Sequence, residues 1–210
     1  MIRIKKEVEP LEWKAKRMTP GFNHYEPIPE LRNALLKEQG YICAYCMREI
    51  PVSKKDLGES ETSKIEHIKS RENHPHKQLD YTNMVICCPG SINGNTHCDK
   101  SKESAEITFS PFDISLQESI SYGSYDGKIK SGNGQWNDEI DKIICLNNAM
   151  LMYNRKQTLD AIVAVLKKQK WKKAKIKELI DEWSNPDHSG KLKQYCGIVI
   201  WYLKKKLRQM

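Results

Sequence analysis

The amino-acid sequence predicts an α+β fold: a small cysteine-rich core of two strands and a helix, then a β-hairpin extension and a C-terminal helical bundle. Two short segments, the alternating residues 64–68 and the apolar residues 84–88, end next to turn-rich or polar segments and indicate strands. Asp126 and Gly127 lie between two further short runs, a pattern typical of a β hairpin. From Asn137 onward, apolar residues recur at helical spacing, which predicts packed helices.

The first two segments are an irregular arm and the core. Residues 1–28 are expected to lack regular structure, because three prolines and a glycine interrupt them. Residues 29–105 are expected to form the core. It begins with a short helix over 29–39, which Gly40 stops, and it ends with a second short helix over 98–105.

The remaining chain is expected to form an extension and a helical region. Residues 106–135 are predicted to be a β extension around the hairpin, with strands at 120–122 and 128–130. Residues 136–210 are predicted to be helical and basic. Their apolar positions recur at helix spacing over 176–183 and again over 192–207, with a polar, proline-containing link between.

Positive charge gathers at the C-terminal end. The chain carries +8 at pH 7. Residues 161–210 hold 13 Lys and Arg against 4 Asp and Glu, whereas residues 1–160 hold 22 against 23. A basic segment suits a polyanion such as nucleic acid, although a solvated helix face has the same composition.

The compartment follows from apolar patterning and cysteine usage. No apolar run approaches the roughly 18 residues that a membrane-spanning helix needs, and the first residues lack the apolar stretch of a signal peptide. We therefore expect a cytoplasmic protein with no membrane partner, in which thiols stay reduced. Five of the seven cysteines lie within 56 residues, and such clustering in a reduced compartment favours a metal site over disulfides.

Two cysteine pairs have spacing suited to structural zinc: Cys43, Cys46, Cys88 and Cys98. Four thiolates close a tetrahedral Zn²⁺ site and leave no open coordination position. Cys88 is preferred because it and Cys87 point to opposite faces of a strand, but Cys87 or His97 stays open as an alternative ligand. Cys145 and Cys196 lie on apolar helical patterns and are expected to be ordinary core residues.

The residues between the two cysteine pairs carry groups suited to phosphodiester hydrolysis. His67, with an ordinary pKa near 6.5, can act as a general base at neutral pH. Glu66 and Asp99 offer hard oxygen ligands for Mg²⁺ or Mn²⁺. Asn83 can hold the loop and orient His67. Lys102, one turn beyond Asp99, is expected to contact a phosphate oxygen.

These motifs resemble the ββα-metal HNH endonucleases in their zinc-binding variant. The similarity rests on the two cysteine pairs and on Glu66-His67, Asn83 and Asp99 in that order. It implies that His67 is the general base, that Glu66 and Asp99 bind the catalytic cation, and that Asn83 supports the loop. The family often has Asp where Glu66 stands, and His or Asn where Asp99 stands.

The resemblance extends toward the C-terminus. The Leu146-Asn147 segment and the closing segment 195–203 are similar to PtuB, the HNH nuclease of the bacterial Septu anti-phage system, which also occurs as a retron effector. That resemblance implies a DNA or RNA substrate and a PtuA-type partner, an ATPase of the ATP-binding-cassette type. The C-terminal helices would then either dock this ATPase or place their lysines along a phosphate backbone.

Two other functions fit parts of the sequence. The first alternative is a non-catalytic zinc-ribbon module that binds nucleic acid or a protein partner. The second is a zinc hydrolase with His67 and His97 as catalytic ligands, which the four available thiolates argue against, because such a site must stay open.

Overall fold

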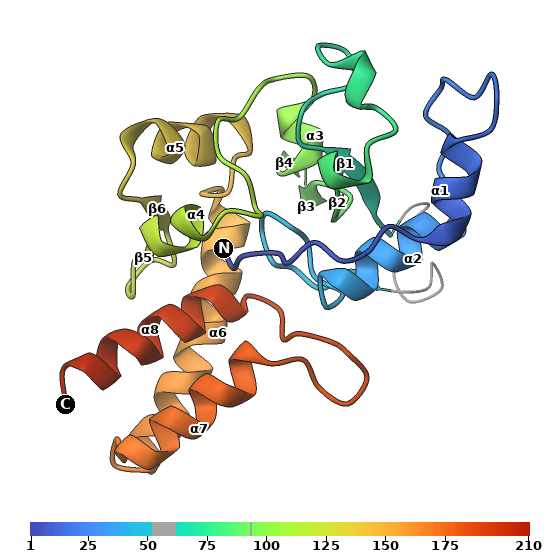
Figure 1. Cartoon of the computed structure of the whole chain (residues 1–210). Helices are drawn as coiled ribbons and strands as arrows, with labels where there is room; N and C mark the ends of the chain where they lie inside the picture. Colours follow the sequence, from blue (N-terminus) through green and yellow to red (C-terminus); the bar gives the residue numbers. More distant parts are fainter. Residues whose placement is uncertain (52–61, 93) are drawn as a thin grey trace.

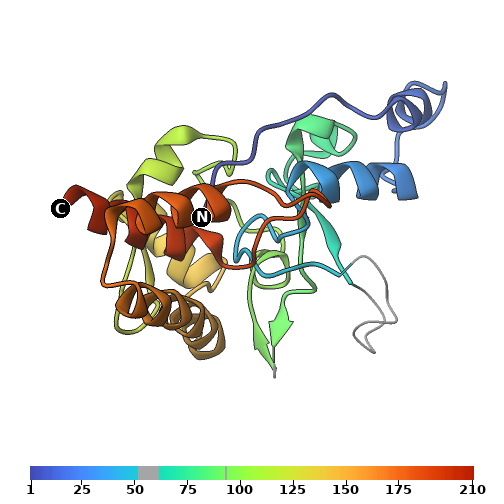
Figure 2. The ribbon, with the colours of Figure 1, turned by 90° about the horizontal axis from the view of Figure 1, so that it is seen from below.

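The computed structural model describes residues 1–51, 62–92 and 94–210 and has the mixed α+β architecture that the sequence predicts (Figure 1). Within these residues, three small antiparallel sheets of two strands each stand among the helices. The cysteine-rich core and the C-terminal helices lie toward opposite ends of the molecule in both views (Figures 1 and 2). None of the described helices combines the length and the apolar character that crossing a bilayer requires.

The core is built on two paired strands and a short helix. Strands β1 (Lys64–His67) and β2 (Met84–Cys87) run antiparallel, with Glu66 opposite Val85. Every residue of β2 is buried, as expected for a strand without a solvent face. Helix α3 (Asp99–Lys102) follows the small hairpin β3 (Ser91–Ile92) and β4 (Asn95–Thr96). Both predicted core strands are confirmed.

The loop between β1 and β2 contains two 3₁₀ turns, η2 (Pro75–Lys77) and η3 (Tyr81–Asn83). Behind the strands, α2 (Pro29–Glu38) has Pro29 in its first turn, where a missing N–H costs nothing. Its buried leucines pack on β2. The helix predicted over 29–39 is therefore confirmed.

The N-terminal arm is not wholly irregular, so that prediction is wrong for α1 (Leu11–Arg17). Pro10 occupies the N-cap position, so it begins the helix rather than interrupting it. One fully buried side chain, Trp13, anchors α1 against the rest of the chain. A seven-residue helix with a single buried position has no apolar periodicity for the sequence to reveal.

The segment 106–135 is only partly β structure. Its hairpin is confirmed, with β5 (Ile120–Tyr122) paired to β6 (Ile129–Ser131). However, α4 (Ile114–Ser119) precedes the hairpin and α5 (Gly134–Asp138) follows it, so the prediction of a β extension is wrong for these residues. The π-helical turn η4 (Glu139–Ile143) then continues α5.

The C-terminal region forms the predicted helical bundle. It consists of α6 (Ala149–Lys168), α7 (Lys173–Ser184) and α8 (Cys196–Arg208). The last helix begins later than its apolar pattern indicates. Leu192 and Tyr195 precede it and contact the cysteine-rich core. Leu192 packs directly on Gly40, and the Tyr195 amide donates to the Met47 carbonyl at 2.8 Å.

A buried arginine ties the helical bundle to the hairpin. Arg155 on α6 is only 1% exposed. Its guanidinium donates to the Gly127 carbonyl at 2.6 Å and to the Leu146 carbonyl at 2.7 Å. These bonds satisfy a buried charge and bring the hairpin turn against α6.

Gly127→Ala should lower the free energy of unfolding by more than about 1–2 kcal/mol, the usual cost of left-handed backbone for an L-residue. Gly127 has φ +71°, and an added Cβ would also lie 2.3 Å from the Met152 carbonyl oxygen. Gly134→Ala is the matched control, because no atom lies within 4 Å of its added Cβ. Equilibrium denaturation measures both; equal stabilities would contradict this account of the turn.

Candidate metal centre and active site

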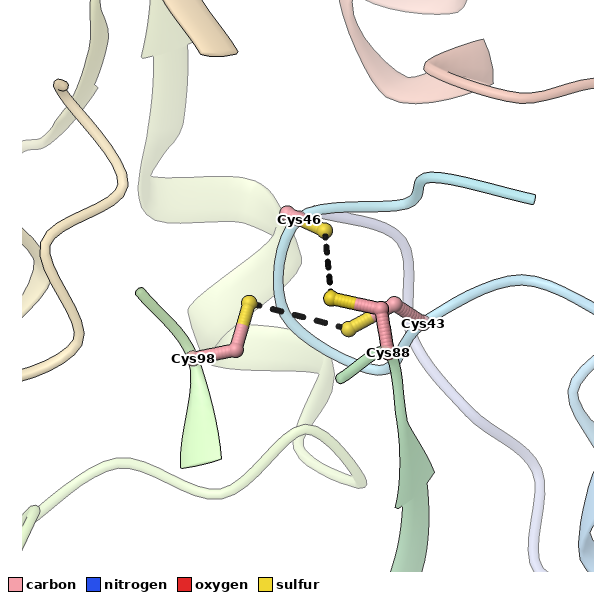
Figure 3. Close-up of side chains that lie close together, drawn as sticks. All are labelled: Cys43, Cys46, Cys88 and Cys98. Atoms are coloured by element: carbon pink, nitrogen blue, oxygen red, sulfur yellow. Dashed lines mark hydrogen bonds between the residues drawn. The ribbon is translucent and has the colours of Figure 1, made fainter. Parts of the chain in front are cut away.

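Four buried cysteines form a group that can hold a zinc ion: Cys43, Cys46, Cys88 and Cys98. Their sulfurs all lie within 4.8 Å of one another. The Cys43–Cys98 and Cys46–Cys88 sulfur distances are both 3.7 Å (Figure 3). Zinc–sulfur bonds of about 2.3 Å place tetrahedral sulfurs about 3.8 Å apart. The spacing of the four side chains therefore suits tetrahedral Zn²⁺.

Backbone hydrogen bonds shape the first cysteine pair into a tight turn. The Cys43 amide donates to the Arg48 carbonyl at 2.9 Å, and the Met47 amide donates to the Cys43 carbonyl at 3.1 Å. The Ala44 amide reaches the Ile86 carbonyl on β2 at 3.1 Å. Because Cys88 directly follows β2, this last bond holds the two halves of the site together.

The neighbouring thiols already favour ionisation of one cysteine. Burial by itself raises the pKa of the Cys43 thiol, but hydrogen bonds from the surrounding cysteines lower that pKa well below its ordinary value. The thiolate is the form that binds metal. The cluster therefore favours the thiolate form at Cys43, whereas burial and the neighbouring thiols raise the pKa of Cys88 and Cys98.

The alternative ligands lie beside this group rather than in it. Cys87 is buried but does not belong to the four sulfurs that converge. His97 is fully buried, with Nδ1 3.2 Å from the Cys98 sulfur, a distance suited to hydrogen bonding with a thiolate. Cys145 departs from its expected place on a helix: it lies half-buried between η4 and α6, with φ +47°. Cys196 is a buried core residue, as expected.

An open pocket of about 900 Å³ adjoins the cysteine group. Glu66, His67 and Asp99 all line it, so the structure brings three of the four predicted catalytic residues to one cavity. Arg71 and Lys100 line the same pocket, together with two further acidic residues, Glu72 and Glu103. The fourth residue, Asn83, is not among the lining residues.

One oxygen of the buried Glu66 carboxyl group contacts both a hydroxyl and an ammonium group. The Tyr45 hydroxyl donates to its Oε1 at 3.0 Å, and Lys102 Nζ lies 3.0 Å from the same atom. Burial and a hydrogen bond with Asp99 raise the pKa of Glu66 to about 8, although the Lys102 charge opposes this. Two neighbouring carboxyl groups repel when both are ionised, and a shared proton or a cation relieves that repulsion.

The expectation that Lys102 contacts phosphate is wrong. Its side chain is buried, and Nζ binds Glu66 and the His67 carbonyl, the latter at 3.3 Å. The sequence also gave no role to Tyr45, although its place inside the Cys-x-x-Cys turn is a signal that could have been used. Both residues contact Glu66 Oε1, one from the turn of the first cysteine pair and the other from α3.

His67 is held by the loop that follows β1. Its Nε2 lies 3.0 Å from the Gln78 carbonyl oxygen. A carbonyl only accepts, so this bond assigns the proton to Nε2 and leaves Nδ1 as the basic nitrogen. Burial lowers the pKa of His67 to about 4, so the ring is neutral at pH 7.

Asn83 fastens both ends of the same loop. Its Oδ1 accepts from the Lys69 amide at 2.8 Å, and its Nδ2 donates to the Lys69 and Lys77 carbonyls at 3.0 and 3.2 Å. The side chain therefore supports the loop, as the sequence predicts. Its influence on His67 is indirect, because the Asn83 carbonyl accepts from the next amide, Ile68, at 2.9 Å.

The N-terminal arm completes the site, which the sequence did not indicate. The Tyr25 ring lies edge-on to His67, with ring centroids 4.6 Å apart. The Arg71 guanidinium lies 4.8 Å from the centroid of the same ring. The Tyr25 amide also donates to Gln78 Oε1 at 3.2 Å. One aromatic side chain from the arm thus packs against both the imidazole and a pocket cation.

Comparison with known proteins does not assign the chain to a family. No family model matches its sequence, and no curated protein matches it. The chemistry of the site is therefore argued from its own residues.

Cys88→Ala should remove most of the bound zinc and lower the unfolding temperature, because three thiolates no longer close a tetrahedral site. Cys87→Ala is the matched control, since the two cysteines are adjacent and equally buried. It should retain about one zinc per chain. Metal content by mass spectrometry and a thermal melt test both variants. Loss of zinc from Cys87→Ala, with zinc retained in Cys88→Ala, would make Cys87 the ligand.

Lys102→Met should lower the free energy of unfolding by roughly 3 kcal/mol, because it leaves a buried carboxyl group without its cation. Adding Glu66→Gln to that variant should restore part of the loss. The measurement is a double-mutant cycle by chemical denaturation. Strictly additive effects would show that the two side chains do not stabilise each other.

Proposed function

We propose that this protein is a metal-dependent HNH endonuclease that hydrolyses nucleic-acid phosphodiester bonds. The observation that carries the proposal is the convergence of His67, Glu66 and Asp99 on one open pocket beside the cysteine group. Glu66 and His67 lie on β1, β2 pairs with β1, and Asp99 begins α3. That arrangement supports the ββα-metal resemblance of the sequence.

Glu66 and Asp99 would hold the catalytic cation, Mg²⁺ or Mn²⁺. Magnesium in phosphate-processing sites commonly takes one or two carboxylates and completes its shell with waters and substrate phosphate. Two adjacent carboxyl groups at a pocket wall fit that donor set. When bound, the cation would neutralise charge on the scissile phosphate and on the leaving oxygen.

His67 would accept the proton of the attacking water. The ring is neutral at pH 7, and the Gln78 carbonyl fixes which nitrogen stays free. A base oriented in this way needs no rearrangement before proton transfer. Arg71 and Lys100, which line the same pocket, would attract the phosphate backbone.

The resemblance to the Septu nuclease supports a wider proposal. The chain would act on DNA or RNA in a cytoplasmic anti-phage complex with a PtuA-type ATPase. The competing proposal is a non-catalytic zinc-ribbon module. The buried Lys102–Glu66 pair favours this alternative, because the ammonium group satisfies the carboxylate without a metal ion.

His67→Ala should reduce cutting by about 10²-fold or more, the usual loss on removing a general base. The substrates are plasmid DNA and total RNA, each with Mg²⁺ or Mn²⁺ and with or without a cognate ATPase. His24→Ala is the control, because His24 is exposed and outside the pocket. Both variants should stay folded and keep the zinc content of the wild type, although loss of the buried His67 ring should lower the melting temperature of that variant.

Two outcomes would reject the nuclease assignment of His67. Equal cutting by the wild type and His67→Ala would remove it as the base. Absence of cutting in every condition, with nucleic-acid or protein binding that is lost only in Cys88→Ala, would favour the zinc-ribbon module.

A further inference from the structure

A second surface with nucleic-acid chemistry lies on the C-terminal helices. We name it the basic–aromatic surface and define it by six side chains: Lys170, Trp171, Trp201, Tyr202, Lys205 and Lys206. Lys206 joins the α6–α7 turn to α8, because its Nζ lies 5.6 Å from the Tyr202 ring centroid and 5.9 Å from the Trp171 ring centroid. Lys205 Nζ lies 5.1 Å from the Trp201 ring centroid.

The C-terminal region around this surface carries an excess of positive charge, and the acidic residues of 161–210 all lie within 178–187. Residues 161–177 contain seven lysines and no acidic residue, and residues 188–210 contain six Lys and Arg and no acidic residue. Within the described parts of the chain, the ion pairs of residues 161–210 engage Lys175, Lys191 and Lys193, and none engages the three lysines of the surface. Such a surface attracts a polyanion.

The aromatic side chains are anchored yet accessible. Trp171, Trp201 and Tyr202 are each partly buried, so one side of each ring packs while another meets solvent. Lys170 and Trp171 are consecutive residues with φ +52° and +55°, a conformation that bulky L-residues rarely adopt. This turn between α6 and α7 sets the Trp171 ring beside α8.

We propose that the basic–aromatic surface binds single-stranded nucleic acid. Ammonium groups would pair with backbone phosphates, and bases would stack on the rings that those ammonium groups now cover. A protein partner fits less well, because the cores of protein interfaces are depleted in lysine. In both views α8 and the α6–α7 turn lie at the end of the molecule away from β1 and α3 (Figures 1 and 2).

The biological purpose of this surface rests on the proposed nuclease function. A strand held at this surface would be retained between encounters with the pocket. Its binding, however, requires neither His67 nor a catalytic cation. The two proposals can therefore fail independently.

The test measures binding without cutting. Full-length His67→Ala protein is titrated, in buffer without Mg²⁺ or Mn²⁺, into a labelled oligo-dT or oligo-U of about 20 nucleotides, long enough for several contacts. The first variant is Lys170→Ala/Lys205→Ala/Lys206→Ala. The control is Lys5→Ala/Lys14→Ala/Lys37→Ala, which removes the same charge from exposed positions elsewhere.

The surface variant should weaken binding about tenfold or more near 0.1 M salt and flatten the salt dependence by about 2 logarithmic units per decade of salt, for three lost phosphate contacts. The control should change affinity by less than about twofold. Tyr202→Leu, which keeps apolar packing but removes the ring, should weaken binding about fivefold. Comparison of the two oligonucleotides distinguishes a DNA from an RNA preference.

Three results would overturn the proposal. They are no binding by the parent protein, unchanged binding by the surface variant, and equal weakening by both triple variants, which would mean diffuse charge alone. Loss of binding to a purified ATPase partner, with nucleic-acid affinity intact, would instead make the surface a protein-docking site.

Discussion

The convergence of four thiols fixes the geometry on which the candidate site depends. It joins the turn after α2, the end of β2 and the start of α3. Tyr45 lies inside that turn and Lys102 lies on that helix, and both reach Glu66 Oε1 at 3.0 Å. Asp99 follows a member of the cysteine group directly. The position of each carboxyl group is therefore set through the cysteine group, although neither carboxyl group belongs to it.

The core is also held by segments far from it in sequence, which argues against treating residues 29–105 as a separate unit. The Cys98 amide donates to the Ile144 carbonyl at 2.9 Å, and the Tyr195 amide donates to the Met47 carbonyl at 2.8 Å. Tyr25 covers His67 from the N-terminal side. Since α8 and the arm both contact the cysteine-rich region, their packing energy contributes to the rigidity of the site.

The sequence predicts the kinds of chemical group in the site better than it predicts which side chains contact each other. Cysteine spacing and apolar strands are local signals, and they predicted the four-sulfur group, β1, β2 and the hairpin. The burial of Lys102 is not a local signal: a lysine on a four-residue helix appears solvent-exposed until Glu66, on a distant strand, is placed beside it. Tyr25 is likewise distant from His67 in sequence. Such contacts depend on tertiary packing, which periodicity does not report.

The buried lysine sets a condition on the proposed chemistry. A cation at Glu66 and Asp99 would lie near the Lys102 ammonium, whose repulsion would weaken cation binding. The same ammonium offsets the repulsion between the two carboxyl groups when no cation is present. A substrate phosphate would add negative charge beside the cation and so offset its repulsion from the Lys102 ammonium. Under the proposed function, the cation would therefore bind firmly only together with substrate. Its binding in the absence of substrate would be weak.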